Sequence, residues 1–274
     1  MPTINGTQFG TFNSPETRRS FRDLVMPIDD LAARSVSLVR RPLPEFSVEG
    51  AAYHLPRYLF VGPKGGAEPI RVGLFAGTNG TELEGTLALR EFVERLELTP
   101  AIARDYCLFL YPLLNPTGYE LGRRETSSGT HIPSQIWKNS NSPEVQQLQS
   151  ELWMHGFDGI VSFNTASESS ELSIAVGGVI FARHLLGNAL QNAQDVLPQW
   201  VDASPAALPR FSGRELRESN DLIRAAPGLK PRPFEIVITI PLKAPTYLQK
   251  AAVSLILQTV LSEYRHFISY GANI

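Results

Sequence analysis

The fold is decided by the stretch RVGLFAGTNGTELEG, residues 71–85. An apolar run of strand type ends near Phe75, glycines follow at Gly77, Gly80 and Gly85, and a helical pattern then begins. A strand, a tight turn and a helix in this order are typical of α/β folds, in which ligands bind beyond the carboxyl ends of the strands. The sequence therefore predicts an α/β sheet with a candidate site at this turn. A purely structural alternative is that the glycines only satisfy the backbone angles of the turn.

Further short runs of strand type alternate with segments of helical period on both sides of this stretch. Several of these runs are apolar almost throughout, which predicts a central sheet that helices cover on both faces. No repeat or linker-like change in composition divides the chain, so we expect one domain over residues 1–274. The predicted strands are Arg57–Val61, Ile70–Phe75, Tyr106–Leu110, Gly159–Phe163, Ser173–Val176 and Glu235–Ile240.

Helix starts are predicted where a capping hydroxyl precedes proline, at Ser14–Pro15, Thr99–Pro100 and Ser142–Pro143. A largely apolar last helix is expected over Pro245–Phe267, packed against the sheet. Core-facing residues at spacings of three and four are Leu89, Val93 and Leu96, then Val145, Leu148 and Leu152, then Leu186, Ala189, Ala193 and Leu197.

Two stretches are predicted to be irregular. Residues 123–141 are rich in Ser, Thr and Asn, and residues 198–233 hold several prolines with a short helical pattern around 214–223. Long irregular segments in a domain of this size often border a functional site.

Composition limits the possible functions. The chain has 274 residues with 25 Lys and Arg against 27 Asp and Glu, a formal charge of −2, so a nucleic-acid partner is not expected. The single cysteine, Cys107, excludes an intrachain disulfide and a cysteine-built zinc cluster. We find neither a signal peptide nor an apolar run long enough to span a membrane, so a soluble, cytoplasmic protein is expected.

The turn and several later segments resemble, in order, the motifs of zinc carboxypeptidases, particularly the branch of succinylglutamate desuccinylase and aspartoacylase. Residues 77–85 are similar to the family's Gly-x-His-Gly-x-Glu-x-x-Gly turn, and residues 112–119 to its Pro-x-x-Asn-Pro-Asp-Gly-Phe segment. Residues 160–165 resemble the strand end Asp-Leu-His-Thr, and residues 234–241 resemble the strand with Thr-Leu-Glu-Thr-Pro.

This resemblance implies a three-layer α/β/α sandwich with a mixed, mostly parallel central sheet. It also implies a zinc ion on two His and one Glu, an arginine for the substrate carboxylate, and a second Glu that activates the zinc-bound water to hydrolyse an amide bond.

The sequence departs from the family at the chemical positions. Asn79 and Asn164 replace the two histidine ligands, and Thr239 replaces the catalytic glutamate, whereas Glu82 keeps the carboxylate ligand. An amide oxygen is a weak neutral ligand that suits hard cations better than zinc, and threonine cannot act as a general base near neutral pH. Magnesium or calcium on Asn79, Glu82 and Asn164 is an alternative, although calcium usually needs six or more oxygen ligands.

The remaining ligand-binding candidates are Glu82, Arg123, Arg124 and His131. An arginine near the site binds a carboxylate through two parallel hydrogen bonds without any metal, although two solvated loop cations are the simpler interpretation of Arg123 and Arg124. His131 together with Glu82 would make a weak two-ligand metal site.

Three hypotheses for the function follow. In the first, the chain is a metallocarboxypeptidase-like protein with a degenerate zinc site that needs no cofactor and binds a small amino-acid-like or peptide-like ligand, or nothing. In the second, it hydrolyses amide bonds of peptides or N-acyl amino acids with a relocated metal, which would be zinc if the family function is retained. In the third, it is a structural or assembly partner.

Overall fold

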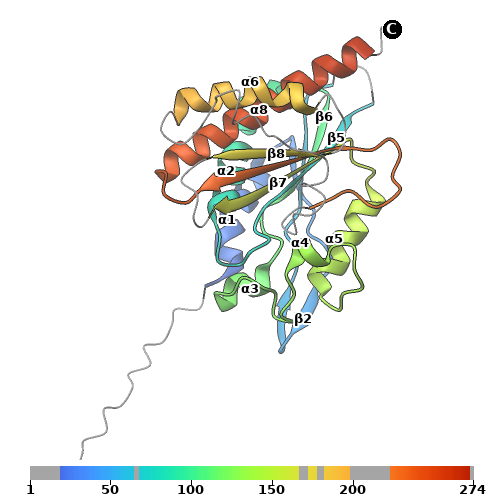
Figure 1. Ribbon diagram of the computed structural model, residues 1–274. Helices are drawn as coiled ribbons and strands as arrows, with labels where there is room; N and C mark the ends of the chain where they lie inside the picture. Colours follow the sequence, from blue (N-terminus) through green and yellow to red (C-terminus); the bar gives the residue numbers. More distant parts are fainter. Residues whose placement is uncertain (1–18, 65–67, 167–171, 178–181, 198–222, 272–274) are drawn as a thin grey trace, which may run out of the picture.

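The computed structural model describes residues 19–64, 68–166, 172–177, 182–197 and 223–271. Within these residues, seven strands form one central sheet and β2 and β3 form a separate hairpin (Figure 1). The order in the sheet is β1-β4-β6-β5-β7-β9-β8, in which only β4 and β8 run against the common direction. The strands are β1 Leu38–Arg40, β2 Phe46–Val48, β3 Ala51–Tyr53, β4 Tyr58–Val61, β5 Ile70–Phe75, β6 Tyr106–Tyr111, β7 Gly159–Ala166, β8 Ser173–Gly177 and β9 Phe234–Pro241.

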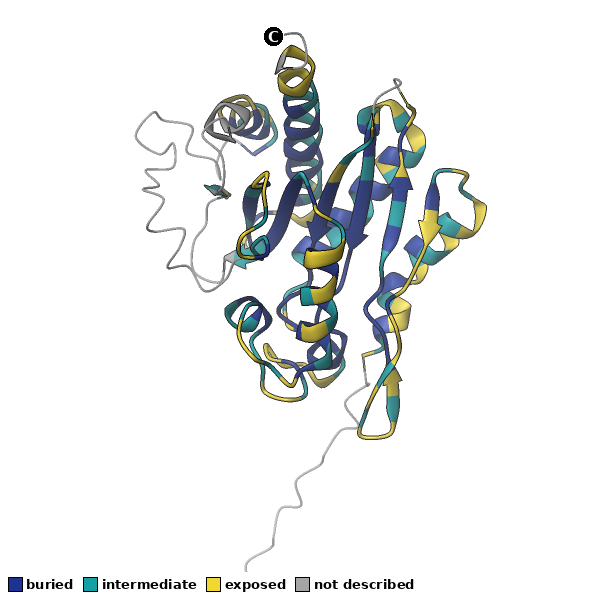
Figure 2. Ribbon diagram, turned by 90° about the vertical axis from the view of Figure 1, so that its right-hand side faces the viewer, coloured by how far each residue is buried: buried dark blue, intermediate teal, exposed yellow. Residues whose placement is uncertain are grey.

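Helices cover both faces of the sheet, as the sequence predicts. The described helices are α1 Phe21–Arg34, α2 Glu84–Leu98, the 3₁₀ helix η1 Pro100–Ala103, α3 Pro116–Leu121, α4 Ile132–Gln135, α5 Pro143–Met154, α6 Ala182–Val196 and α8 Thr246–Gly271. α2, α6 and α8 share one core with strand residues such as Leu74 and Ile238, and α4 and α5 pack against the other face on residues such as Phe75 and Ile160. The strands between these layers are largely buried (Figure 2).

The six predicted strands are confirmed, with ends that differ by three residues at most. β1, β2 and β3 are not among the predicted strands, because a strand of three residues is too short to show alternation of apolar and polar side chains. The predicted helix over Pro245–Phe267 is present as α8. The proposed helix start at Ser14–Pro15 and the helical pattern around 214–223 lie outside the described residues, apart from Ile223.

One predicted helix start needs correction, and a second is confirmed without the predicted hydroxyl cap. After Thr99 the chain forms one 3₁₀ turn instead of an α-helix, because Asp105 turns the chain with φ 69° and β6 starts at the next residue. Ser142 precedes α5 as expected, but its hydroxyl donates to the Glu144 carboxylate at 2.6 Å instead of capping the helix. Residues 123–141 are also less irregular than predicted, because they include α4.

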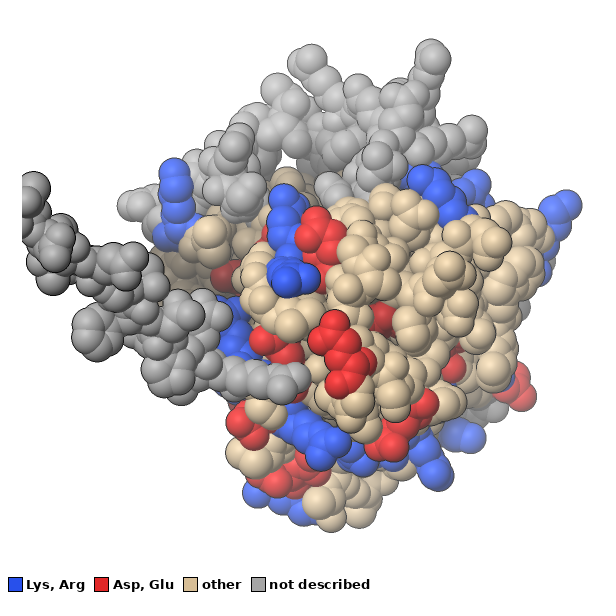
Figure 3. Space-filling model, turned by 90° about the horizontal axis from the view of Figure 1, so that it is seen from below, with Lys and Arg blue, Asp and Glu red and all other residues tan. Residues whose placement is uncertain are grey.

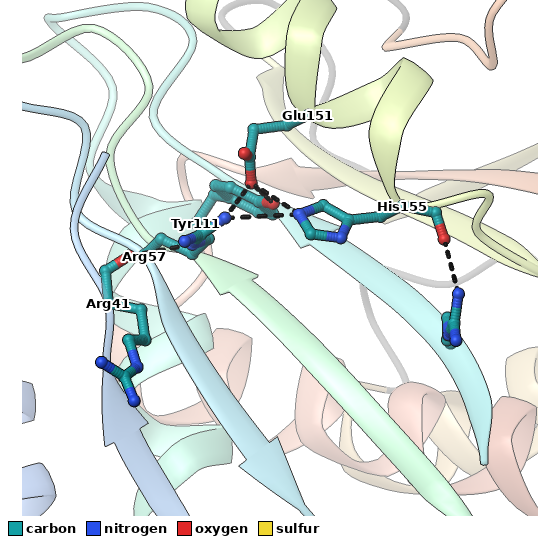
Figure 4. Close-up of polar contacts among 6 residues, drawn as sticks. Arg41, Arg57, Tyr111, Glu151 and His155 are labelled. Carbon is teal, nitrogen blue, oxygen red and sulfur yellow. Dashed lines mark hydrogen bonds and ion pairs between the residues drawn. The ribbon is translucent and has the colours of Figure 1, made fainter. Parts of the chain in front are cut away.

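A buried cluster of charged side chains fastens α5 to the sheet (Figure 4). The carboxylate of Glu151 accepts from the Tyr111 hydroxyl at 2.5 Å and from Arg57 Nη1 at 2.6 Å, and it lies 3.2 Å from Nε2 of His155. Burial alone would raise the pKa of Glu151, but the hydrogen bonds from His155, Tyr111 and Arg57 and the Arg57 cation outweigh it and lower the pKa. The cluster therefore keeps the Glu151 carboxylate ionised between α5 and the sheet.

In the part of the chain that the structure describes, no helix combines the length and the apolar character that crossing a bilayer requires.

Candidate functional site

The turn after β5 depends on two of its glycines. Gly77 has a left-handed φ of 65°, which side chains rarely adopt, and a Cβ there would lie 2.7 Å from Leu113 Cδ1. A Cβ on Gly80 would lie 2.2 Å from the Gly118 carbonyl carbon and 2.5 Å from the Arg123 oxygen. Both glycines are therefore required by the close approach of the turn to the segment after β6.

Asn115 joins these two segments from a fully buried position. Its Oδ1 accepts from the Gly118 amide at 2.8 Å and so caps α3. Its Nδ2 donates to the Arg124 carbonyl at 2.8 Å and to the Thr78 carbonyl at 3.3 Å. One side chain therefore fixes the position of Arg124 relative to the turn after β5.

Glu82 is held by hydrogen bonds from two neighbouring segments. Asn79 Nδ2 donates to Oε1 of Glu82 at 2.5 Å, and the backbone N–H of Thr165, at the end of β7, donates to Oε2 at 3.1 Å. The Asn79 oxygen accepts from the backbone N–H of Thr81 at 3.0 Å and from its hydroxyl at 2.8 Å. The Asn79 amide therefore accepts from Thr81 through its oxygen and donates to the Glu82 carboxylate through its nitrogen.

A shallow hollow of about 50 Å³ lies at this end of the sheet, beyond the carboxyl ends of β5 and β7. This is the point at which the strand order reverses, since β6 lies on one side of β5 and β7 on the other. The hollow is lined by Thr78, Asn79, Glu82, Arg124, His131, Pro133, Asn164 and Thr165.

The structure thus brings five of the predicted site residues together and leaves two apart. Arg123 does not line the hollow, and its backbone N–H bonds to the Gly118 carbonyl at 2.8 Å. Thr239 does not line it either, although its Cα pairs with that of Asn164 across β7 and β9. Parallel partners point to the same side of a sheet, so Thr239 lies beside Asn164 in one polar row.

Thr165 is a site residue that the sequence did not predict, and it bonds to two carboxylates, Glu82 in the turn and Glu84 at the start of α2. Besides its N–H bond to Glu82, its hydroxyl donates to Oε2 of Glu84 at 3.0 Å. In the sequence, its position directly after the candidate residue Asn164, at the end of a strand, could have indicated a role at the site.

Burial raises the pKa of the half-buried Glu82 carboxyl. The Thr165 hydrogen bond and the Arg124 cation act in the opposite direction, and the nearby Glu84 adds to the rise. The negative charge of Glu82 is therefore stabilised by hydrogen bonds from the Thr165 backbone and the Asn79 amide and by the Arg124 cation.

The donors for a metal ion at this hollow are few. The lining offers one carboxylate, one imidazole and two amides, from Glu82, His131, Asn79 and Asn164. Among the described residues no group of three or more His, Cys, Asp or Glu side chains is arranged to hold a metal ion. The Asn79 oxygen is already bonded within the turn, so the hollow lining does not supply the three protein ligands that are typical of a catalytic zinc site.

Replacing Asn115 by alanine should lower the free energy of unfolding by about 3 kcal/mol, because it removes a helix cap and leaves two buried carbonyls without a donor. Urea denaturation is the measurement, with Asn141→Ala as the control at an exposed position. A loss below about 0.5 kcal/mol, the range of ordinary surface substitutions, would contradict this role.

No protein-family model matches the sequence, and no curated protein matches it. Solved structures do match. They include a metallo-carboxypeptidase from Burkholderia cenocepacia, with a TM-score of 0.67 and 13% identity over 89% of this chain and 69% of that one. A metallo-carboxypeptidase from Pseudomonas aeruginosa in complex with (2-guanidinoethylmercapto)succinic acid has a TM-score of 0.65 and 18% identity over 88% of this chain and 68% of that one.

A third match has a size close to that of this chain. It is a protein from Shewanella denitrificans OS217 described as a "putative metallopeptidase", with a TM-score of 0.61 and 18% identity over 89% of this chain and 90% of that one. At such low identities the likeness establishes the fold alone. The chain therefore has the carboxypeptidase-like α/β fold, with a mixed, mostly parallel sheet of seven strands between helices in the residues described.

Proposed function

We propose that this carboxypeptidase-like protein binds the carboxylate of a small amino-acid-like or peptide-like ligand and does not catalyse zinc-dependent hydrolysis. The observation that carries the proposal is the pair of hydrogen bonds that Glu82 accepts from Asn79 and Thr165. At the first histidine position of the family's motif, Asn79 donates to the carboxylate that would otherwise join it in binding a metal. This arrangement supports a degenerate zinc site.

Arg124 gives the hollow a cation suited to a carboxylate. A guanidinium group can bind a carboxylate through two parallel hydrogen bonds and does so without a metal. The volume of about 50 Å³ exceeds the roughly 10–15 Å³ of cavity that one water molecule needs by the same measure, and it accommodates a carboxylate-sized group. The rest of the ligand would extend over the surface. The Pseudomonas aeruginosa neighbour binds a succinic acid derivative, a molecule with two carboxyl groups, which supports this class of ligand.

The catalytic position also favours binding over hydrolysis. Thr239 stands where the resemblance places the general base, and a hydroxyl does not take up a proton near neutral pH. General acid–base catalysis typically contributes about 10²- to 10⁴-fold in rate, so its loss would remove most of the hydrolytic activity.

A metal-dependent amide hydrolase is the second candidate function. It rests on the finding that Glu82 and His131 line the same hollow and so offer a carboxylate and an imidazole to one ion. Two protein ligands make a weaker site than the three or four usual for zinc, which is why we place this function second.

The charge distribution supports a small molecule as the partner in preference to a nucleic acid. The formal charge is −2, and in Figure 3 acidic and basic side chains are interspersed among neutral ones on the visible described surface. Phosphate backbones are bound by clustered Lys and Arg, a pattern that this face does not present within the described residues.

The test is calorimetric titration with (2-guanidinoethylmercapto)succinic acid in the presence of a metal chelator. We expect saturable binding that Arg124→Gln weakens by about tenfold or more, since a hydrogen bond to a charged group contributes about 1.5–3 kcal/mol. Arg123→Gln is the matched control and should leave the affinity unchanged, because Arg123 does not line the hollow.

Two outcomes would overturn the proposal: no binding in the presence of the chelator, whether or not binding appears without it, or equal effects of the two substitutions. A panel of peptides and N-acyl amino acids tests the second candidate separately. Turnover that requires added metal and is lost in Glu82→Gln and His131→Gln would establish the hydrolase.

A further inference from the structure

A second and larger pocket lies away from the turn after β5. It has a volume of about 240 Å³ and is lined by Arg22, Val25, Asp29, Arg40, Glu45 and His54. Three of these residues come from one face of α1, at spacings of three and four, and the others come from β1, the approach to β2 and the connection between β3 and β4. Pockets for drug-sized molecules span about 300–1,000 Å³, so this pocket suits a smaller molecule.

His54 in the lining has a buried ring nitrogen, Nε2, to which no described residue forms a hydrogen bond. The side chain is 8% exposed. The ring packs edge-on against Phe21, with 5.3 Å between the ring centroids. A buried nitrogen without a hydrogen bond is unfavourable, so a ligand that pairs with it would gain affinity.

The charges around His54 are of both signs. Asp29 is already paired, since its Oδ1 accepts from Arg40 Nε and from the Tyr58 hydroxyl, both at 2.7 Å. Arg22 and Glu45, both exposed, line the same pocket, and neither forms an ion pair with another described residue. Burial and the Arg40 and Arg22 cations lower the pKa of His54, which keeps the imidazole neutral at neutral pH. One cation and one carboxylate therefore remain beside a neutral imidazole.

We propose that this pocket binds a small zwitterion of the amino-acid type, with the carboxylate beside Arg22, the ammonium group beside Glu45, and a polar atom on His54 Nε2. A zwitterion matches both remaining charges, whereas a simple anion would face the Glu45 carboxylate and a simple cation would face Arg22. The proposal is independent of the function proposed for the hollow at Glu82.

The experiment follows the histidine side-chain resonances of the isotopically labelled full chain by NMR during titration with L-leucine. His54→Gln identifies the His54 signals. The blocked analogues N-acetyl-L-leucine and L-leucinamide and inorganic phosphate are titrated in parallel. We expect saturable shifts of the His54 signals with L-leucine, and affinities for each blocked analogue and for phosphate that are lower by about tenfold or more. Arg22→Gln and Glu45→Gln should each weaken binding of L-leucine to a similar extent.

Two matched controls separate this pocket from other sites. Arg41→Gln removes an exposed arginine next to Arg40 that does not line the pocket, and Arg124→Gln removes the arginine of the other hollow. Both variants should keep the affinity for L-leucine. If L-leucine does not shift the His54 signals at millimolar concentration, if an analogue or phosphate binds as well as L-leucine, or if Arg124→Gln abolishes the shifts, the proposal is wrong.

Discussion

Replacing Asn79 and Asn164 by histidine should raise the affinity for zinc by at least about a thousandfold. Structural zinc sites with four protein ligands bind with about 10–16 kcal/mol, so each added ligand contributes roughly 3 kcal/mol, or about a hundredfold in affinity. Both positions line the hollow beside Glu82, and together the three side chains would supply two imidazoles and one carboxylate. Part of the gain is offset because the imidazole introduced at position 79 would no longer donate to Glu82 as the Asn79 amide does. The measurement is zinc titration of metal-stripped protein.

Two further variants make the result specific. Glu82→Gln in the doubly substituted background should remove most of the gain, because it replaces the charged ligand by an amide. Thr239→Glu in the same background adds a carboxylate in the strand beside position 164 and completes the residues expected from the resemblance. An affinity for zinc that stays at the unsubstituted level would show that these positions do not correspond to the family's ligand positions, and the proposal of a degenerate zinc site would then be wrong.

The fold could be predicted from the sequence because its central features are local. The run before Phe75, the glycines after it and the helical pattern from Glu84 define a strand, a turn and a helix within fifteen residues, and the structure has all three. The apolar composition of β6 and β9 indicated a sheet covered on both faces, and both strands are largely buried there. β1 was not predicted because it has only three residues, of which one is buried, and so shows no alternation of buried and exposed side chains.

The site was predictable as a set of positions but not as a set of contacts. The shared hollow of Glu82, Arg124 and His131 follows from where strands and loops end, which the ordered motifs indicate. That Arg124 lines the hollow while Arg123 does not depends on the bond between Asn115 Nδ2 and the Arg124 carbonyl, which spans nine residues. The sequence also does not show which group a serine hydroxyl will bond. The Ser142 hydroxyl was predicted to cap a helix, but it donates to the Glu144 carboxylate.

Replacing Glu151 by glutamine should lower the free energy of unfolding at neutral pH by about 3–5 kcal/mol. The side chain is only 6% exposed, and its loss of charge leaves Arg57 without its carboxylate in a largely buried position. Glutamine keeps the volume of the side chain, so the effect reports the charge and its hydrogen bonds and not a cavity. Glu94→Gln is the matched control, since Glu94 pairs with Arg90 on the exposed face of α2 and such pairs contribute at most about 1 kcal/mol.

The effect of Glu151→Gln should also depend on pH in a defined direction. Because the pKa of Glu151 is lower in the folded chain than in the unfolded chain, its ionised form stabilises the fold above the unfolded-state value. This stabilisation is lost progressively as the pH falls through the lowered folded-state pKa, and the glutamine variant lacks it at every pH. Urea denaturation should therefore show a large difference in the free energy of unfolding between the variant and the unsubstituted chain at neutral pH. At acid pH the difference should be small. An equal difference at both pH values would show that the hydrogen bonds of the Glu151 side chain stabilise α5 with no contribution from the ionised carboxylate.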